Sequence, residues 1–211
     1  KKVIALSTDK AANPINIYGA TKLASDKLFV AANNLSGSKG TMFSVVRYGN
    51  VFASRGSVVP FFEKLVREKN SFFPITDKKM TRFVIKISDA IKLVENSFKF
   101  MKGGEIVIPK IPSLRIIDLA RAFDSRKKIK IIGIRPGEKL HEILCPRDDS
   151  RLTLEFKNHF IIIPSINLNH SIKKFIVNNR KEKGKFVKSD FEYHSGTNIN
   201  FLNVNQIKKL L

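Results

Sequence analysis

Hydrophobic residues form short runs along the chain, with polar and glycine-containing segments between them. Val3 to Leu6 is continuously apolar, and Met42 to Tyr48 forms a second, mostly apolar run bounded by Gly-Asn. Such runs are typical of strands that are covered on both faces. From Ile17 to Asn34, apolar and small residues recur at three- and four-residue steps, which predicts an amphipathic helix ending in the Ser/Gly segment 36–40. Strand, helix and strand in this order predict the βαβ unit of a parallel sheet.

The same alternation continues along the chain to about residue 164. It predicts helices at 58–69, 88–101 and 113–123, and strands at 105–109, 130–133 and 160–163. Residues 173–196 are polar and basic with little periodicity, which indicates a loop-rich segment, and 205–211 predict one or two closing helical turns. Alternating strands and helices favour an α/β fold with a parallel sheet.

Composition first suggests a different class of protein. The 211 residues contain 39 Lys and Arg against 18 Asp and Glu, a net charge of +21, as in many proteins that bind nucleic acids or anionic membranes. However, the basic pairs lie far apart in the sequence and form no stripe, so a solvated surface is favoured and no nucleic-acid partner is expected. A basic polyanion-binding protein on a decayed enzyme fold stays open as an alternative, and DNA binding that weakens steeply with salt would reveal it.

Cysteine and histidine content restricts the sites that the sequence can form. Cys145 is the single cysteine, and the four histidines show no zinc-ligand spacing, so neither an internal disulfide nor a metal site is expected. No apolar run approaches the roughly 20 residues that a membrane helix needs. We therefore expect a cytoplasmic protein with no membrane partner.

The strongest candidate chemistry follows the first predicted strand. Thr8, Asp9 and Lys10 come directly at its end, and Tyr18 and Lys22 lie four residues apart on the next helix. Residues at this spacing share a helix face, and a cation beside a phenol favours the phenolate. A Tyr-x-x-x-Lys pair alone is weak, but this one lies next to the carboxyl edge of a parallel sheet, where such folds bind ligands.

Five segments in order carry a resemblance that extends to about Pro164. The chain resembles the extended short-chain dehydrogenase/reductases, and most closely the nucleotide-sugar 4,6-dehydratases that act on UDP-N-acetylglucosamine with inversion at C5. The matching segments are Ser7 to Ala11 with Tyr18 to Lys22, Arg47 to Val51 with Ser54 to Pro60, Thr76-Asp77 with Met80 to Phe83, Gly103 to Ile106 with Pro109 to Ser113, and Gly133 to Glu142.

This resemblance implies a fold, a cofactor and partners. It implies part of a Rossmann-type parallel sheet with a smaller C-terminal substrate-binding domain. The expected boundaries are 1–52 for the Rossmann part, 53–164 for a mainly substrate-binding region with interleaved Rossmann elements, and 165–211 for a basic, loop-rich tail. The implied cofactor is NADP, the substrate is a UDP-sugar, the full-length protein is a homo-oligomer, and the product enters pseudaminic acid biosynthesis.

The resemblance also implies a role for individual residues. Asp9 and Lys10 would exchange protons with the sugar, with Lys10 as the C5 base and Asp9 as the acid, whereas His141 is interpreted as structural. The implied catalytic residues are Thr8, Asp9, Lys10, Tyr18 and Lys22. The implied cofactor-binding residues are Tyr18, Lys22 and Tyr48, and the implied substrate-binding residues are Asn50, Arg82, Arg135 and Glu138.

One family feature is absent from the sequence. Dinucleotide binding in this fold uses a Gly-rich turn after the first strand, and the 11 glycines of the chain never adopt that spacing. We therefore expect an N-terminally truncated, inactive fragment. A retaining dehydratase or an epimerase of the same fold stays open as an alternative, although many retaining enzymes have Asp-Glu where this chain has Asp9-Lys10.

The missing Gly-rich turn generates a prediction about turnover. The 211-residue chain should give no 4-keto product from UDP-N-acetylglucosamine and NADP, because nothing in it binds the cofactor phosphates. A version extended at its N-terminus by a strand and a Gly-rich turn should give that product, as NMR of the reaction mixture would show. Detectable 4-keto product from the 211-residue chain alone would contradict the expectation.

Overall fold

A computed structural model describes residues 1–37, 40–165, 172–178 and 181–211. The chain forms two compact units, which are described separately. The first unit contains residues 1–48, 88–110 and 143–193, and the second contains 49–87, 111–142 and 194–211. The units interleave along the chain, whereas the expected ranges 1–52, 53–164 and 165–211 are continuous. The expected ranges were defined by the motifs they contain and the units by their internal contacts, so those domain boundaries stay a prediction.

A six-stranded sheet is the centre of the first unit. Its order is β1-β2-β6-β11-β10-β12. β1, β2 and β6 are parallel, and β11, β10 and β12 continue the sheet antiparallel. This confirms the predicted α/β class with a parallel sheet. The strands are β1 (Lys2–Thr8), β2 (Met42–Tyr48), β6 (Ile106–Pro109), β11 (His159–Ile162), β10 (Thr153–Glu155) and β12 (Lys185–Phe186).

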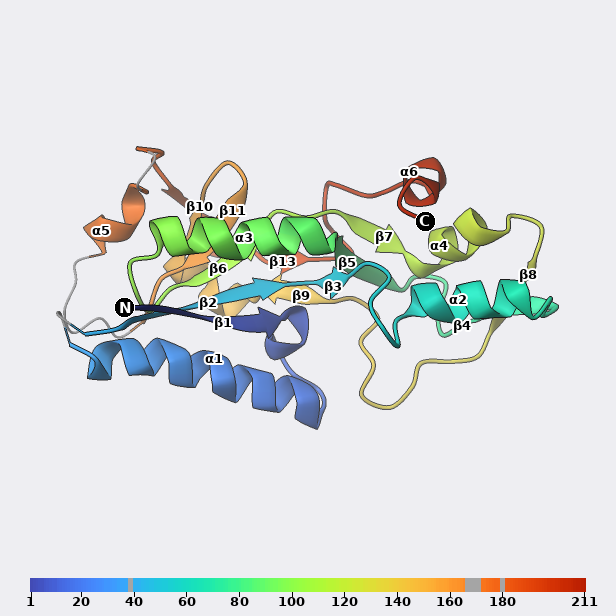
Figure 1. The fold of residues 1–211 in the computed structure, drawn as a ribbon, viewed down its shortest axis with the longest axis horizontal. Helices are drawn as coiled ribbons and strands as arrows, with labels where there is room; N and C mark the ends of the chain where they lie inside the picture. Colours follow the sequence, from blue (N-terminus) through green and yellow to red (C-terminus); the bar gives the residue numbers. More distant parts are fainter. Residues whose placement is uncertain (38–39, 166–171, 179–180) are drawn as a thin grey trace. The chain divides into compact units, whose positions relative to one another are not determined.

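Helix α1 (Ile17–Leu35) connects β1 to β2 and packs along both strands (Figure 1). It begins after Asn16, whose side chain accepts a hydrogen bond from the Gly19 N–H, and it ends at Ser36. Gly37 then adopts a φ of +69°, the left-handed conformation that commonly follows a helix. Of the predicted Ser/Gly terminator 36–40, residues 38–39 lie outside the described residues.

A buried ion pair joins α1 to the sheet. Asp26 on α1 and Arg47 on β2 are 1% and 2% exposed. Asp26 Oδ2 accepts from Arg47 Nε at 3.3 Å and from Nη2 at 2.9 Å, and Arg47 Nη1 donates to the Leu144 carbonyl at 3.0 Å. Because an unpaired charge in this interior would be costly, each partner requires the other. The pair therefore fixes how α1 lies on β2.

The second unit contains two small sheets and three helices around one apolar core. The sheet β3-β5-β7 consists of Asn50–Val51, Thr81–Ile85 and Ser113–Arg115, and β4 (Phe72–Ile75) pairs with β8 (Lys128–Ile131). The helices are α2 (Val58–Arg67), α4 (Ile116–Phe123) and α6 (Val204–Lys208). Phe62, Phe73 and Leu119 are among the buried residues of this core. Asn203 and Gln206 form a capping box at the start of α6.

The remaining elements show where periodicity was a good predictor. Helices predicted at 58–69 and 88–101 occur at 58–67 and as α3 (Ile87–Phe100), and the strands predicted at 105–109 and 160–163 occur within one residue. The helix expected from 113 begins only at 116, because β7 precedes it. β4, β5, β9 (Ile143–Cys145) and β10 were not predicted, since each has at most five residues and no clear alternation.

The segment expected to be loop-rich contains short elements. These are α5 (Lys173–Ile176), β12 and β13 (Tyr193–His194). α6 lies at the closing helical turns predicted for 205–211. Elsewhere, η1 (Asp9–Ala11) and η2 (Arg147–Leu152) are short 3₁₀ segments. Within the predicted tail, residues 166–171 and 179–180 lie outside the described part of the chain. Among the residues that are described, no helix combines the length and the hydropathy needed to cross a membrane.

The buried pair generates a stability prediction. Asp26→Asn should lower the free energy of unfolding by about 3–5 kcal/mol, because it leaves the Arg47 charge buried without a counter-ion. Glu68→Gln is the control: it breaks the exposed Lys64–Glu68 pair, whose side chains are 65% and 53% exposed, and should cost less than about 0.5 kcal/mol.

Urea unfolding followed by circular dichroism measures both changes. Replacing both partners with apolar residues, Asp26→Leu with Arg47→Met, should recover most of the stability lost in Asp26→Asn, because no buried charge remains. Equal, small losses of unfolding free energy in Asp26→Asn and Glu68→Gln would show that the buried pair does not fix how α1 lies on β2.

Candidate functional site

The first set of candidate residues lies at the carboxyl end of β1 and β2. Thr8 is the last residue of β1 and lies opposite Tyr48, the last residue of β2. The chain then turns into η1, which begins with Asp9 and Lys10. The Thr8 hydroxyl caps this turn by accepting from the Lys10 N–H at 3.4 Å. The parallel register therefore brings Thr8, Asp9, Lys10 and Tyr48 to one edge of the sheet.

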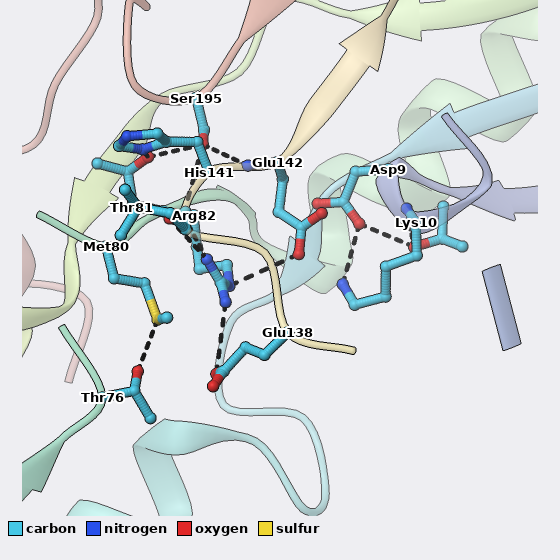
Figure 2. Close-up of polar contacts among 12 residues, drawn as sticks. Asp9, Lys10, Thr76, Met80, Thr81, Arg82, Glu138, His141, Glu142 and Ser195 are labelled. Carbon is cyan, nitrogen blue, oxygen red and sulfur yellow. Dashed lines mark hydrogen bonds and ion pairs between the residues drawn. The ribbon is translucent and has the colours of Figure 1, made fainter. Parts of the chain in front are cut away.

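Asp9 is completely buried, and its two carboxylate oxygens differ. Oδ1 accepts from the Thr8 hydroxyl at 2.9 Å. It also accepts from Lys10 Nζ at 3.0 Å (Figure 2). Among the described residues, Oδ2 has no hydrogen-bond partner. The Lys10 side chain is 32% exposed, so one member of this ion pair reaches solvent and the other does not. Two donors therefore hold Oδ1 in place, whereas Oδ2 can still accept a hydrogen bond.

Tyr18 and Lys22 lie on the first two turns of α1. Tyr18 is 51% exposed, and Lys22 Nζ donates to the Leu6 carbonyl of β1 at 3.0 Å. Gly19 allows this start of the helix to lie against the η1 turn, since a Cβ at that position would come within 2.5 Å of the Lys10 carbonyl oxygen. The structure therefore places Lys22 beside the end of β1 and leaves the Tyr18 phenol accessible.

Tyr48 lies near the Tyr18 phenol. Burial raises the pKa of Tyr48 above its ordinary value, and the neighbouring Tyr18 raises it further. Tyr48 is thus a neutral hydroxyl at physiological pH, able to donate one hydrogen bond. The three residues predicted to hold the cofactor, Tyr18, Lys22 and Tyr48, belong to the same unit as the acid/base candidates.

The second set of candidates belongs to the second unit, and Arg82 on β5 is its most connected member. Its Nη1 donates to the Thr81 carbonyl at 2.7 Å and to the Leu140 carbonyl at 3.3 Å. Its Nη2 lies 3.6 Å from Glu138 Oε1, and its Nε lies 3.7 Å from Glu142 Oε1. Figure 2 shows the guanidinium between these two carboxylates. With 11% exposure, the Arg82 side chain is held in one orientation.

Glu138, Arg135 and Asn50 complete this second set. The Arg135 N–H donates to Glu138 Oε2 at 3.3 Å, and the Glu138 N–H donates back to the Arg135 carbonyl at 3.0 Å. This turn leaves the Arg135 side chain exposed. Asn50 begins β3 opposite Val84 of β5, and its buried Oδ1 has no hydrogen-bond donor among the described residues. Arginines and an amide are suited to phosphate oxygens and hydroxyls.

Sequence reasoning missed the polar network that surrounds Arg82. The Thr81 hydroxyl lies 2.8 Å from His141 Nδ1 and 2.7 Å from Ser195 Oγ, and the Glu142 N–H donates to Ser195 Oγ at 2.8 Å. His141 packs against His194, with ring centroids 4.9 Å apart. Thr81 is 60 positions from His141 and 114 positions from Ser195 in the sequence. No local spacing could therefore have indicated the network.

The residues present fit one end of a dinucleotide cofactor. The Tyr18 phenol is accessible, and the Lys22 ammonium has N–H donors beyond the one bound to the Leu6 carbonyl. These two groups can bind a ribose and lie beside a nicotinamide. The sequence has no Gly-rich turn for the cofactor's phosphates. Within the described ranges, no group of three or more potential metal ligands occurs.

The chain is similar to proteins named for reactions of sugar nucleotides. A family model described as polysaccharide biosynthesis protein matches residues 1–164. The inverting UDP-N-acetylglucosamine 4,6-dehydratase of Campylobacter jejuni strain 81-176 is 59% identical over 198 residues, covering 94% of this chain and 59% of the relative. A UDP-glucose 4-epimerase of Rickettsia bellii is 37% identical, covering 100% of this chain and 61% of its own length. The chain thus spans about three fifths of the length of these relatives.

Solved structures share the fold. Pen from Bacillus thuringiensis is 33% identical, with a TM-score of 0.82, and the match covers 100% of this chain and 61% of Pen. The dTDP-glucose 4,6-dehydratase DesIV from Streptomyces venezuelae, solved with NAD bound, has a TM-score of 0.57 at 18% identity, covering 66% of this chain and 49% of DesIV. The second likeness shows the fold alone.

His141 generates a pH prediction. Burial lowers its pKa below the ordinary 6.5, and the neighbouring His194 and Arg82 lower it further, while Asp77 opposes them. Below pH 6.5 the unfolded chain therefore binds a proton that folded His141 does not, so the free energy of unfolding should fall as the pH falls through this window.

Thermal unfolding between pH 5 and 8 measures this effect. His141→Gln keeps a hydrogen-bonding side chain toward Thr81 but cannot titrate, so its stability should vary less with pH than that of the unsubstituted chain. The same pH dependence in both proteins would show that His141 is not its source.

Proposed function

Since this chain belongs to the polysaccharide biosynthesis protein family, we propose that the protein is a nucleotide-sugar 4,6-dehydratase. It converts UDP-N-acetylglucosamine to UDP-2-acetamido-2,6-dideoxy-4-keto-hexose with inversion at C5. The observation that carries this proposal is the 3.0 Å contact between Lys10 and the buried Asp9 at the end of β1. Identity of 59% with an enzyme named for this reaction supports it.

The Asp9–Lys10 contact offers both forms that a dehydration needs. A C5 base must be a neutral amine, and the group that protonates the leaving hydroxyl must be a carboxylic acid. Transfer of one proton from Lys10 Nζ to Asp9 across their contact creates both groups without any exchange with solvent. Asp9 has 0% exposed side-chain surface, so the transferred proton would not be lost directly to water.

Tyr18 acts first in the proposed reaction. Its phenolate removes the proton from the sugar O4, and the Lys22 ammonium on the same helix face stabilises the negative charge of the phenolate. The chemistry that a nicotinamide supplies when bound is acceptance of hydride from C4 and its later return to C6, so no net oxidation occurs. Tyr48 and Lys22 supply hydrogen-bond donors for that group, and the Thr8 hydroxyl keeps Asp9 in place.

The elimination then uses the neighbouring pair. The 4-keto group acidifies the C5 proton, and the neutral Lys10 amine removes it. The electron pair forms the C5–C6 double bond, the C6–O bond breaks, and Asp9 gives its proton to the departing hydroxyl, which leaves as water. Solvent would then supply a proton to C5 on the face opposite Lys10, and Tyr18 would return its proton to solvent, which restores the phenolate. With the hydride returned to C6, this gives the inverted product.

The UDP part of the substrate is assigned to the second unit. Arg82 and Arg135 supply guanidinium donors for the diphosphate, for which their planar geometry is suited. Asn50 Oδ1, which has no donor among the described residues, can accept a hydrogen bond from a ligand, and the Glu138 carboxylate can accept from ribose hydroxyls.

The finer parts of the proposal rest on the family resemblance. We propose NADP as the cofactor, a cytoplasmic location, a homo-oligomer, and a product that serves pseudaminic acid biosynthesis. Similarity to a UDP-glucose 4-epimerase supports a second candidate, epimerisation at C4. That reaction needs no proton transfer at C5 or C6, so it would leave the Asp9–Lys10 contact without a chemical role.

Two substitutions separate the roles of Lys10 and Asp9 in the N-terminally extended protein. Lys10→Ala should abolish deuterium exchange at C5 in D₂O and lower turnover by about 10²–10⁴-fold, because the base is lost. Asp9→Asn should lower turnover similarly but retain exchange at C5, because the proton can still leave while water cannot.

NMR of the sugar nucleotide measures both exchange and product. Lys27→Ala, which removes an exposed lysine of α1, is the control and should change neither. Unchanged exchange in Lys10→Ala would remove Lys10 as the base, and loss of exchange in Asp9→Asn alone would reverse the assignment.

A further inference from the structure

Ser195 is fully buried in the second unit. It lies in the segment 173–196, which was predicted to be loop-rich because its sequence has little periodicity. It follows β13 and lies beyond residues 1–164, the part of the chain that the family model matches. A serine with no exposed surface needs hydrogen-bond partners, and its partners here are two residues next to the proposed diphosphate site.

Both backbone groups of Glu142 are bound by Ser195. The Glu142 N–H donates to Ser195 Oγ at 2.8 Å, and the Ser195 N–H donates to the Glu142 carbonyl at 2.8 Å. Ser195 Oγ also lies 2.7 Å from the Thr81 hydroxyl and 3.4 Å from the Thr81 carbonyl oxygen (Figure 2). One hydroxyl thus connects β5 to the segment that leads into β9.

Thr81 and Glu142 are also the residues that hold the inner side of the Arg82 guanidinium. The Thr81 carbonyl accepts from Nη1 at 2.7 Å, and Glu142 Oε1 lies 3.7 Å from Nε. The Glu142 side chain is only 4% exposed, so it is a fixed counter-ion. Ser195 therefore contacts the Thr81 carbonyl and the backbone of Glu142, which carries the carboxylate, without contacting Arg82 itself.

On its other side, at Nη2, the guanidinium pairs with Glu138, a partner that a ligand can replace more easily than Glu142. Nη2 lies 3.6 Å from Glu138 Oε1, about as far as Nε lies from Glu142, but the Glu138 side chain is 26% exposed whereas that of Glu142 is 4% exposed. A phosphate oxygen, which forms charge-assisted hydrogen bonds with arginine, can replace this carboxylate at Nη2. The inner contacts then keep the guanidinium aimed at the phosphate.

We propose that Ser195 is a positioning residue for diphosphate binding: through Thr81 and Glu142 it orients Arg82 toward the phosphates of the nucleotide. This inference rests on the proposed function, because it assumes that Arg82 binds the diphosphate of a UDP-sugar. It assigns a role to the C-terminal segment that neither the sequence pattern nor the family match indicates.

UDP and uridine test the proposal on the 211-residue chain, because they differ only in the diphosphate. Ser195→Ala removes the hydroxyl and leaves the Glu142 N–H without its acceptor. It should weaken UDP binding by about threefold to tenfold, the effect of one lost buried hydrogen bond, and leave uridine binding unchanged. Isothermal titration calorimetry gives both affinities. Ser189→Ala, which removes an exposed hydroxyl, is the control and should alter neither.

A double-mutant cycle shows whether the effect passes through Arg82. In an Arg82→Ala background, Ser195→Ala should cause no further loss of UDP affinity, because no guanidinium remains to be oriented. A second, matched pair avoids dependence on one variant: Thr81→Val should weaken UDP binding as Ser195→Ala does, and Thr81→Ser should restore it.

The outcomes distinguish this inference from the proposed function. If the unsubstituted chain binds UDP and Ser195→Ala binds it equally well, the positioning role is wrong and the proposed function stands. Equal losses for UDP and uridine would show a merely structural role and overturn the inference as well. If the unsubstituted chain does not bind UDP, the assignment of UDP to the second unit fails, and the positioning role fails with it.

Discussion

Two charges with almost no exposed surface, on Asp26 and Arg47, join α1 to β2, and the first candidate set depends on this contact. Asp26 lies four residues after Lys22 and eight after Tyr18, so all three share one face of α1. Since an unpaired buried charge is costly, α1 cannot rotate or slide without losing the pair. The pair thereby fixes Lys22 at the Leu6 carbonyl and Tyr18 beside the end of the sheet.

The chain uses arginine in two different ways, and the difference lies in what surrounds each guanidinium. Arg47 is enclosed by Asp26 and the Leu144 carbonyl, which makes it part of the scaffold. Arg82 is fixed on its inner side by buried groups, but on its outer side it pairs with the partly exposed Glu138. A charge held firmly on one side and loosely on the other can exchange its loose partner for a ligand, as anion binding requires.

Local periodicity was sufficient to predict the β1-α1-β2 unit, and with it that Thr8, Asp9 and Lys10 follow β1 at the carboxyl edge of a parallel sheet. It did not give the register that places Tyr48 opposite Thr8. It could not predict β5, which has only five residues and is defined by pairing with β3 and β7. Nor could it predict Ser195, whose partner Thr81 lies 114 positions away. Arg47 did leave a signal, since an arginine inside an apolar strand requires a buried carboxylate.

The configuration at C5 of the product tests the proposed chemistry most directly. The N-terminally extended protein is incubated with UDP-N-acetylglucosamine in D₂O, and the product is identified by NMR. The proposed reaction predicts a 6-deoxy-4-keto sugar with deuterium at C5 and the configuration at C5 inverted. A 4-keto product with retained configuration, or the C4 epimer of the substrate with its C6 hydroxyl intact, would contradict it.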